Sequence, residues 1–170
     1  NSSYSVSPVE KLFPFLKGSS EFNPPIYIDD VVVWYILFDG YCRKVSKKDF
    51  KVLDEQPIQK WLTLPDTLNW SQINTGYIQG KSLVLIGKDK VLLAERKGKA
   101  FQYERETVPQ HYFANWPYSW GTGNVSAARL LPSENKVVFY RNMESAVYTI
   151  NQKTIEKVVP LKLKWIGEIK

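Results

Sequence analysis

The chain has 170 residues, of which 44% are hydrophobic and 14% aromatic, and this composition excludes an intrinsically disordered protein. The formal charge of +6 comes from lysines and arginines mixed with acids along most of the chain, which disfavours a nucleic-acid-binding face. The longest apolar run, residues 31–38, is too short for a membrane-spanning helix, and the single cysteine, Cys42, excludes an internal disulfide framework.

Residues 1–25 are predicted to form an irregular N-terminal segment, because Asn23-Pro24-Pro25 cannot continue a helix or a central strand. Within this segment, residues 12–16 read Leu-Phe-Pro-Phe-Leu, and we expect them to pack on the core as a plug. The chain begins with Asn1 rather than Met. We therefore expect that an upstream segment has been removed, and a secretory signal or lipoprotein leader would fit.

The first regular elements are predicted to be a hairpin followed by a short helix. Residues 26–38 indicate one long strand, which turns at Asp39-Gly40 into a returning strand over residues 41–45. A helix is predicted over residues 54–64. It has acidic residues and a proline near its start and an apolar face made of Ile58, Trp61 and Leu62.

The rest of the chain indicates short strands separated by glycine-containing turns, interrupted only over residues 107–127. The predicted strands cover residues 76–78, 82–86, 91–95, 100–105, 128–131, 137–140, 146–150 and 158–166. In the last of them Leu161, Leu163 and Trp165 alternate with lysines. We predict an all-β fold, an antiparallel meander of about ten strands arranged as a sandwich or an open propeller-like array, in a single domain over residues 26–170.

A hairpin-sized unit repeats three times, imperfectly, in this domain. Each copy starts with an acidic or amide residue followed by an apolar run, at residues 30–35, 89–93 and 135–140. A turn and a second apolar stretch follow each time. Repetition of such a unit favours a repeating β-architecture over a catalytic scaffold.

The first and third copies resemble the DKNYY-type repeats of bacterial envelope lipoproteins. The matching residues are Asp30, Val32, Trp34, Tyr35, Asp49 and Phe50 in the first copy, and Asn135, Lys136, Val137, Phe139, Tyr140, Thr154 and Ile155 in the third. The middle copy keeps only Asp89-Lys90 and its leucines, and the copies are unevenly spaced. The resemblance covers about half the chain, and it implies a non-catalytic protein of the bacterial periplasm or outer-membrane surface.

The residues needed for catalysis or metal binding are sparse. His111 is the only histidine, and the sequence contains neither a Gly-x-Ser-x-Gly elbow nor a phosphate-binding glycine loop. We expect Cys42 to be a small buried hydrophobic residue, although Arg43 and Lys44 beside it could lower a thiol pKa. We therefore predict that the protein is not an enzyme and holds no metal or cofactor.

The candidate binding site is an aromatic-rich segment over residues 111–124, which follows neither the helical nor the strand period. Long aromatic loops often serve recognition, because Tyr and Trp give a large contact area at low entropic cost. The predicted partner-binding residues are Tyr112, Asn115, Trp116, Tyr118, Trp120 and Asn124. The alternative is that Trp116 and Trp120 close an open end of the core.

These observations favour an exported, envelope-associated protein that acts by binding another protein, for instance an immunity or inhibitor protein that neutralises a secreted toxin. Two alternatives remain open: a carbohydrate-binding module that uses the same aromatic residues, and a fragment of a larger β-propeller. A nucleic-acid partner is disfavoured, and contact with a membrane is expected only through a removed lipid anchor.

Overall fold

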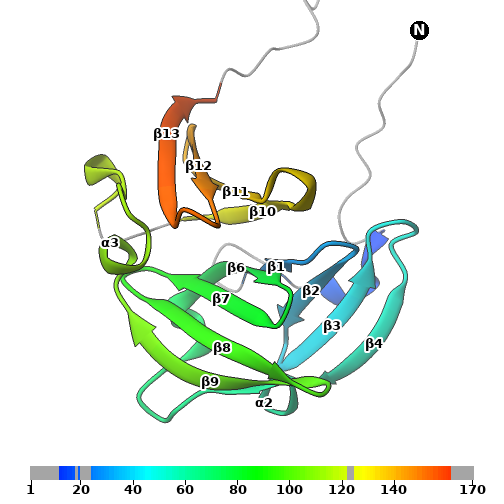
Figure 1. Cartoon of the computed structure of the whole chain (residues 1–170). Helices are drawn as coiled ribbons and strands as arrows, with labels where there is room; N and C mark the ends of the chain where they lie inside the picture. Colours follow the sequence, from blue (N-terminus) through cyan, green and yellow to red (C-terminus); the bar gives the residue numbers. More distant parts are fainter. Residues whose placement is uncertain (1–11, 18, 20–23, 122–124, 162–170) are drawn as a thin grey trace, which may run out of the picture.

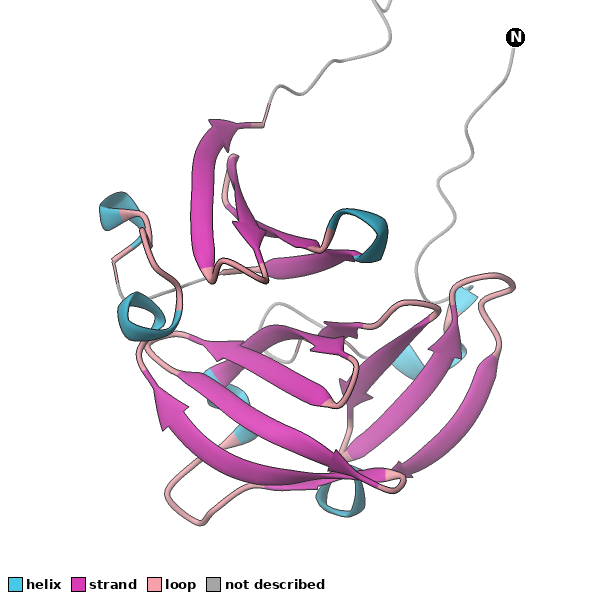
Figure 2. Cartoon of the chain, in the orientation of Figure 1, coloured by secondary structure: helices cyan, strands magenta, loops and turns pink. Residues whose placement is uncertain are grey.

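The computed structural model describes residues 12–17, 19, 24–121 and 125–161. These residues form thirteen strands in two sheets, a nine-stranded one that curls beneath a four-stranded one (Figures 1 and 2). The order in the large sheet is β4-β3-β2-β1-β6-β7-β8-β9-β5, and in the small sheet β10-β11-β12-β13. The strands are β1 (Ile26–Asp29), β2 (Val33–Phe38), β3 (Tyr41–Ser46), β4 (Val52–Pro57), β5 (Leu62–Thr63), β6 (Ile73–Gln79), β7 (Ser82–Gly87), β8 (Val91–Lys97), β9 (Ala100–Thr107), β10 (Ala127–Leu131), β11 (Lys136–Arg141), β12 (Glu144–Thr149) and β13 (Thr154–Pro160).

The short helical turns lie between these strands. They are η1 (Pro14–Leu16), α2 (Ile58–Trp61), η2 (Trp70–Gln72), α3 (Pro109–Tyr112), η3 (Tyr118–Trp120) and η4 (Pro132–Glu134). No helix among the described residues is long and apolar enough to cross a membrane.

Twelve of the strands make three four-stranded antiparallel units, which we call blade 1 (β1–β4), blade 2 (β6–β9) and blade 3 (β10–β13). Their innermost strands β1, β6 and β10 begin at residues 26, 73 and 127, at intervals of 47 and 54 residues. Blades 1 and 2 belong to one sheet because β1 pairs in parallel with β6. The predicted β architecture is therefore confirmed, and the arrangement is propeller-like. The described residues form thirteen strands instead of about ten, and the parallel β1–β6 pair departs from the predicted antiparallel meander.

The predicted long strand over residues 26–38 is wrong, because a turn at residues 30–32 divides it into β1 and β2. The apolar run hides this turn, since Val31 and Val32 are exposed valines that read like strand residues. Within the turn the Asp30 N–H donates to the Val33 carbonyl oxygen. The predicted turn at Asp39-Gly40 is confirmed, with both residues at positive φ.

The predicted helix over residues 54–64 is also wrong in its first half, which is the outer strand β4. This outermost strand pairs with one neighbour only, and both of its faces are exposed to solvent. Its sequence therefore carries few apolar residues and resembles the polar first turn of a helix. Only the four residues of α2 are helical. Ile58, Trp61 and Leu62 are nevertheless buried together, as their spacing predicted.

The three sequence copies do not occupy equivalent places in the blades. The first and third lie on β2 and β11, the second strands of blades 1 and 3, whereas residues 89–93 lie at β8, the third strand of blade 2. This offset of one strand explains the uneven spacing of the copies. The strand of blade 2 that corresponds to β2 and β11 is β7.

The core consists of apolar clusters between successive blades. One cluster fills the space between blades 1 and 2, and a second, centred on Phe139 and Tyr148, fills the space between blades 2 and 3. The opposite face of blade 1 is covered by the N-terminal segment, where Phe13 and Leu16 pack against Ile36. The predicted plug is thus confirmed for Phe13 and Leu16, whereas Leu12 is exposed. It lies on the blade 1 face that points away from blade 2.

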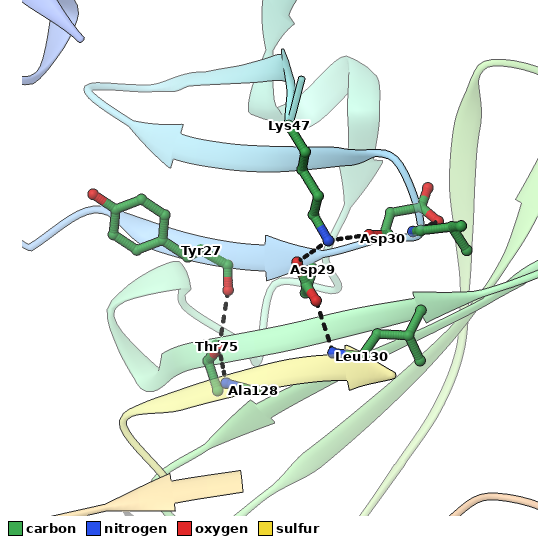
Figure 3. Close-up of polar contacts among 8 residues, drawn as sticks. Tyr27, Asp29, Asp30, Lys47, Thr75, Ala128 and Leu130 are labelled. Atoms are coloured by element: carbon green, nitrogen blue, oxygen red, sulfur yellow. Dashed lines mark hydrogen bonds and ion pairs between the residues drawn. The ribbon is translucent and has the colours of Figure 1, made fainter. Parts of the chain in front are cut away.

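Blade 3 joins the other inner strands through side chains rather than through a backbone ladder (Figure 3). The Leu130 N–H donates to the Asp29 carboxylate at 2.7 Å, and Lys47 forms an ion pair with the other oxygen of that carboxylate at 2.6 Å. The Thr75 hydroxyl donates to the Tyr27 carbonyl at 2.9 Å and accepts from the Ala128 N–H at 3.2 Å. Two alternate N–H groups of β10 are thus satisfied by the buried side chains of β1 and β6.

The last predicted strand starts earlier than expected, since β13 begins at Thr154 and follows β12 through a tight turn. The part of that prediction over residues 162–166, with Leu163 and Trp165, lies outside the described residues.

Candidate functional site

The aromatic segment connects blade 2 to blade 3, and its two tryptophans belong to the core. Trp116 is 9% exposed and Trp120 1% exposed, and both lie in the cluster between blades 2 and 3. The Trp116 ring stacks on Phe113 at 5.3 Å between centroids and meets Trp120 edge-on at 5.7 Å. The tryptophans therefore close one end of the core, which is the alternative that the sequence left open.

Hydrogen bonds from side chains hold the loop between these tryptophans in one shape. The Trp116 indole N–H and the Gln110 amide both donate to the Gly121 carbonyl oxygen, at 2.9 and 2.6 Å. The Trp120 indole N–H donates to Glu144 at 2.7 Å, and Arg141 donates to the Ser119 carbonyl at 3.0 Å. The loop is thus anchored to α3 on one side and to blade 3 on the other.

Tyr118 stands at the tip of this anchored loop with its side chain wholly in solvent. It is 100% exposed, which no other large apolar or aromatic residue in the described part of the chain approaches. Beside it lies a hollow of about 530 Å³, lined by Gln110, Trp116, Pro117, Tyr118, Ser119, Gly121 and Arg141. Because the loop is already ordered, a partner contacting Tyr118 would not have to order it on binding.

The other predicted site residues have different surroundings. Asn115 is exposed at positive φ, and its amide donates to the Thr154 hydroxyl at 3.0 Å, close to where the Ala114 backbone bridges β13. The local backbone explains the asparagine at this position, since asparagine tolerates the left-handed conformation better than most residues. Asn124 lies outside the described residues. Of the six predicted residues, Trp116 and Tyr118 line one hollow, and Trp120 is buried behind it against Trp116.

Tyr112 faces inward, toward two other phenols. Tyr77, on the inner strand of blade 2, is fully buried, and burial raises its pKa well above the ordinary value, as do the neighbouring phenols Tyr112 and Tyr148. Burial likewise raises the pKa of Tyr112 and of Tyr148. These three hydroxyl groups therefore stay protonated at neutral pH and support the junction of blades 2 and 3.

The residues considered for catalysis lie apart from one another. His111 is exposed on α3, and Cys42 is buried in the cluster between blades 1 and 2, as a small hydrophobic residue would be. Burial raises the pKa of the Cys42 thiol, so it is protonated and unreactive at neutral pH. Within the described ranges no group of three or more His, Cys, Asp or Glu side chains is arranged to hold a metal ion.

Sequence reasoning missed Arg141 and Gln110, which line the hollow beside Tyr118. Arg141 directly follows the third repeat, at the end of β11, and comes to the loop only because blade 3 packs against it. No local sequence pattern could have placed Arg141 beside Ser119, which lies 22 residues earlier in the chain.

Comparison with known proteins shows the fold. No family model and no curated protein matches the chain. Among solved structures, it is similar to the hemopexin fold protein CP4 from cow pea, with a TM-score of 0.66 and 13% identity over 91% of this chain and 76% of that one. It is also similar to a plant albumin from Cicer arietinum showing hemagglutination (TM-score 0.70, 12% identity, 93% and 77%). A third similar structure is LS24, a seed albumin from Lathyrus sativus (0.68, 15%, 94% and 77%).

At these identities the similarity carries the fold alone. The chain has a hemopexin-like propeller fold, built in the described residues from three blades. The resemblance to DKNYY-type repeats and the expected export are not tested by these matches and stay predictions.

Proposed function

We propose that this protein is a non-catalytic binding module that recognises a protein partner through Tyr118 and the hollow beside it. The observation that carries the proposal is a fully exposed tyrosine on a loop anchored by two buried tryptophans. Tyrosine, tryptophan and arginine are the residues most enriched at the energetic centres of protein interfaces. Tyr118 and Arg141 supply two of them on an ordered scaffold.

A protein partner is better supported than a carbohydrate. A sugar-binding platform needs two or more exposed aromatic rings in one plane. Within residues 111–121, all of which the structure describes, Tyr118 is the only exposed Tyr, Trp or Phe. Trp116 and Trp120 meet at 84° and are buried. Asn115, which would line a sugar groove, bonds to Thr154 instead.

The cellular setting belongs to the same proposal. The resemblance of the first and third repeats to DKNYY-type envelope repeats supports an exported, envelope-associated protein. In that setting the partner would be another envelope or secreted protein, and neutralising a toxin is one role that such a module could serve.

The test is an affinity capture from lysate and envelope extract of the source organism, read by mass spectrometry, with Tyr118→Ala alongside the unaltered protein. A matched control is Tyr41→Ala, which removes a second exposed tyrosine on blade 1. We expect one stoichiometric partner with the unaltered protein and the control. With Tyr118→Ala, binding should weaken by about 2 kcal/mol, roughly 30-fold in Kd.

Three results would oppose the proposal. Capture of the same partner by Tyr118→Ala would move the site elsewhere. An empty capture combined with Tyr118-dependent binding on a glycan array would favour the carbohydrate module. An empty capture without glycan binding would leave the hollow without a ligand of either class.

A second candidate is that the chain is part of a larger propeller. It is supported by the incomplete burial of one face of blade 3. Along β11 and β12, buried residues alternate with half-buried ones, whereas the middle strands of blade 2 are buried on both faces. The half-buried face carries Val138, Tyr140 and Val147. If a further blade covered it, the isolated chain should self-associate with increasing concentration, and sedimentation velocity would measure this.

A further inference from the structure

A second hollow, of about 590 Å³, opens where the three inner strands begin, and it is separate from the Tyr118 hollow in all its lining residues. Ile26 starts β1, Ile73 starts β6, and Val125 and Ser126 directly precede β10. The remaining walls come from Pro24 and Pro25 before β1, from the end of β2 with its turn, from α2 and from η2. A volume of this size is within the range of roughly 300–1,000 Å³ that is usual for small-molecule sites.

The hollow is a pocket rather than a passage between the blades. Farther along the inner strands, Thr75 hydrogen-bonds to both neighbouring strands, and Asp29 holds the Leu130 N–H (Figure 3). Thr75 is 1% exposed and Asp29 5% exposed, so solvent does not reach past them. A molecule entering at the start of the inner strands would stop at this layer.

The walls are mostly apolar and are held in place by specific bonds. Leu37, Phe38 and Ile58 line one side, and the Ile58 N–H donates to the Gly40 carbonyl at 2.9 Å. On the other side η2 presents Trp70 and Ser71. It is fixed by a capping box in which the Asn69 side chain accepts from the Ser71 N–H at 3.0 Å.

Asn74 adds a polar group, because a β-bulge turns it out of the ladder. Ile73 pairs with Gly87 and Thr75 with Ile86, which leaves Asn74 as an extra residue lining the pocket. The bulge depends on Gly87, since any side chain there would collide with the Gln72 carbonyl oxygen. Within the described residues the Asn74 amide makes no hydrogen bond, so its donors and its acceptor are free for a ligand. Bulges often re-aim a side chain beside a binding site.

We propose that this pocket binds an uncharged, largely apolar small molecule whose carbonyl or hydroxyl group hydrogen-bonds to Asn74. Among the described residues that line the pocket, Asp39 is the one with an ionisable side chain, and it lies exposed in the turn between β2 and β3. An anion would meet this carboxylate and no cation, and a charged ligand would be desolvated by the apolar walls without a buried partner. The proposal is independent of the Tyr118 site.

Titration with prodan, a neutral naphthalene ketone whose emission shifts to the blue in apolar surroundings, tests the proposal. We expect saturable binding of one molecule per chain. Ser71→Trp, at an exposed wall position, should fill the pocket and weaken binding at least about tenfold. Its matched control is Ser133→Trp, an exposed serine on η4 outside the pocket, which should bind as the unaltered protein does.

Asn74→Leu removes the hydrogen bond without adding much volume and should weaken binding roughly three- to tenfold. It also keeps the test valid if Ser71→Trp fails to fold, which circular dichroism would reveal. Tyr118→Ala should leave prodan binding unchanged, so failure here and failure of the protein-binding proposal can be told apart. Absence of saturable binding, or binding that neither Ser71→Trp nor Asn74→Leu weakens, would overturn the proposal.

Discussion

The two junctions between the blades are built differently. Blades 1 and 2 share a sheet, because β1 and β6 pair through their backbones over residues 27–29 and 75–77. Blade 3 has no such ladder to either neighbour in the described residues, and is held by the side chains of Asp29 and Thr75 and by an aromatic cluster. A backbone ladder tolerates most substitutions, whereas a side-chain junction depends on individual residues. Point mutations should therefore loosen blade 3 far more readily than they separate blades 1 and 2.

The largest effect is expected for Trp120→Ala, which would leave a large cavity between blades 2 and 3. Loss of a buried tryptophan costs about 3–5 kcal/mol of unfolding free energy, and Glu144 would also lose its hydrogen-bond donor. Urea denaturation measures the change. The control is Tyr118→Ala two residues away, which should alter stability by less than about 0.5 kcal/mol because the side chain is fully exposed. Equal losses for the two variants would contradict the assignment of Trp120 to the core.

Asp29→Ala should have the next largest effect, because it leaves the Leu130 N–H and the Lys47 ammonium without their shared acceptor. An orphaned buried group such as the Leu130 N–H costs about 1–3 kcal/mol, whereas Lys47 is partly exposed and keeps its hydrogen bond to the Asp30 carbonyl, so we expect a total loss of about 2–3 kcal/mol. Asp29→Asn is the matched variant. It keeps an acceptor for Leu130 while removing the charge, and should lose about half as much. If the two substitutions were equally costly, the loss would come from the ion pair within blade 1, and the hydrogen bond from Leu130 would contribute nothing measurable.

Alkaline pH tests the same junction through Tyr77. Burial and the adjacent phenols raise its pKa in the folded protein, while the unfolded chain titrates near the ordinary value of about 10. The stabilising contribution is therefore complete below pH 10 and is lost as the pH rises toward the folded-state pKa. Above pH 10 the unfolding free energy should fall by about 1.4 kcal/mol per pH unit from this residue. In Tyr77→Phe the curve of unfolding free energy against pH should be flatter by that amount. An unchanged slope would show that the buried Tyr77 hydroxyl does not have a raised pKa in the folded protein.

Much of the fold could be predicted from the sequence, because strand-sized apolar stretches separated by glycine-containing turns mark the strands and hairpins of a β protein. Most of blades 2 and 3 was located in this way, and the turn at Asp39-Gly40 was identified from two residues. The predictions that failed did so because the local sequence fitted two structures equally well. Three valines in a row hid the turn between β1 and β2, and the polar outer strand β4 resembled the start of a helix.

The candidate site was harder to predict, since exposure is a tertiary property. The aromatic loop was found from composition, but composition does not distinguish Trp120, buried under blade 3, from Tyr118, which lies in solvent. The distinction depends on Glu144, which accepts the Trp120 N–H from a strand 24 residues away. The pocket lined by Asn74 had no sequence signal either, because a bulge arises from the register of two strands.

Of these substitutions, Thr75→Val should change the global unfolding free energy least, and its effect should be confined to one strand. Its hydroxyl bonds to Tyr27 of blade 1 and Ala128 of blade 3, so valine of similar shape would orphan the Ala128 N–H at a cost of about 1–2 kcal/mol. The β1–β6 ladder would keep its backbone bonds. Amide hydrogen exchange should therefore accelerate at Ala128 and its neighbours in β10, while the amides of β1 and β6 stay protected. Thr75→Ser, which retains the hydroxyl, should preserve the slow exchange at Ala128. If exchange accelerated equally in all three inner strands, blade 3 would not be a separately attached unit, and the contrast between the two junctions would fail.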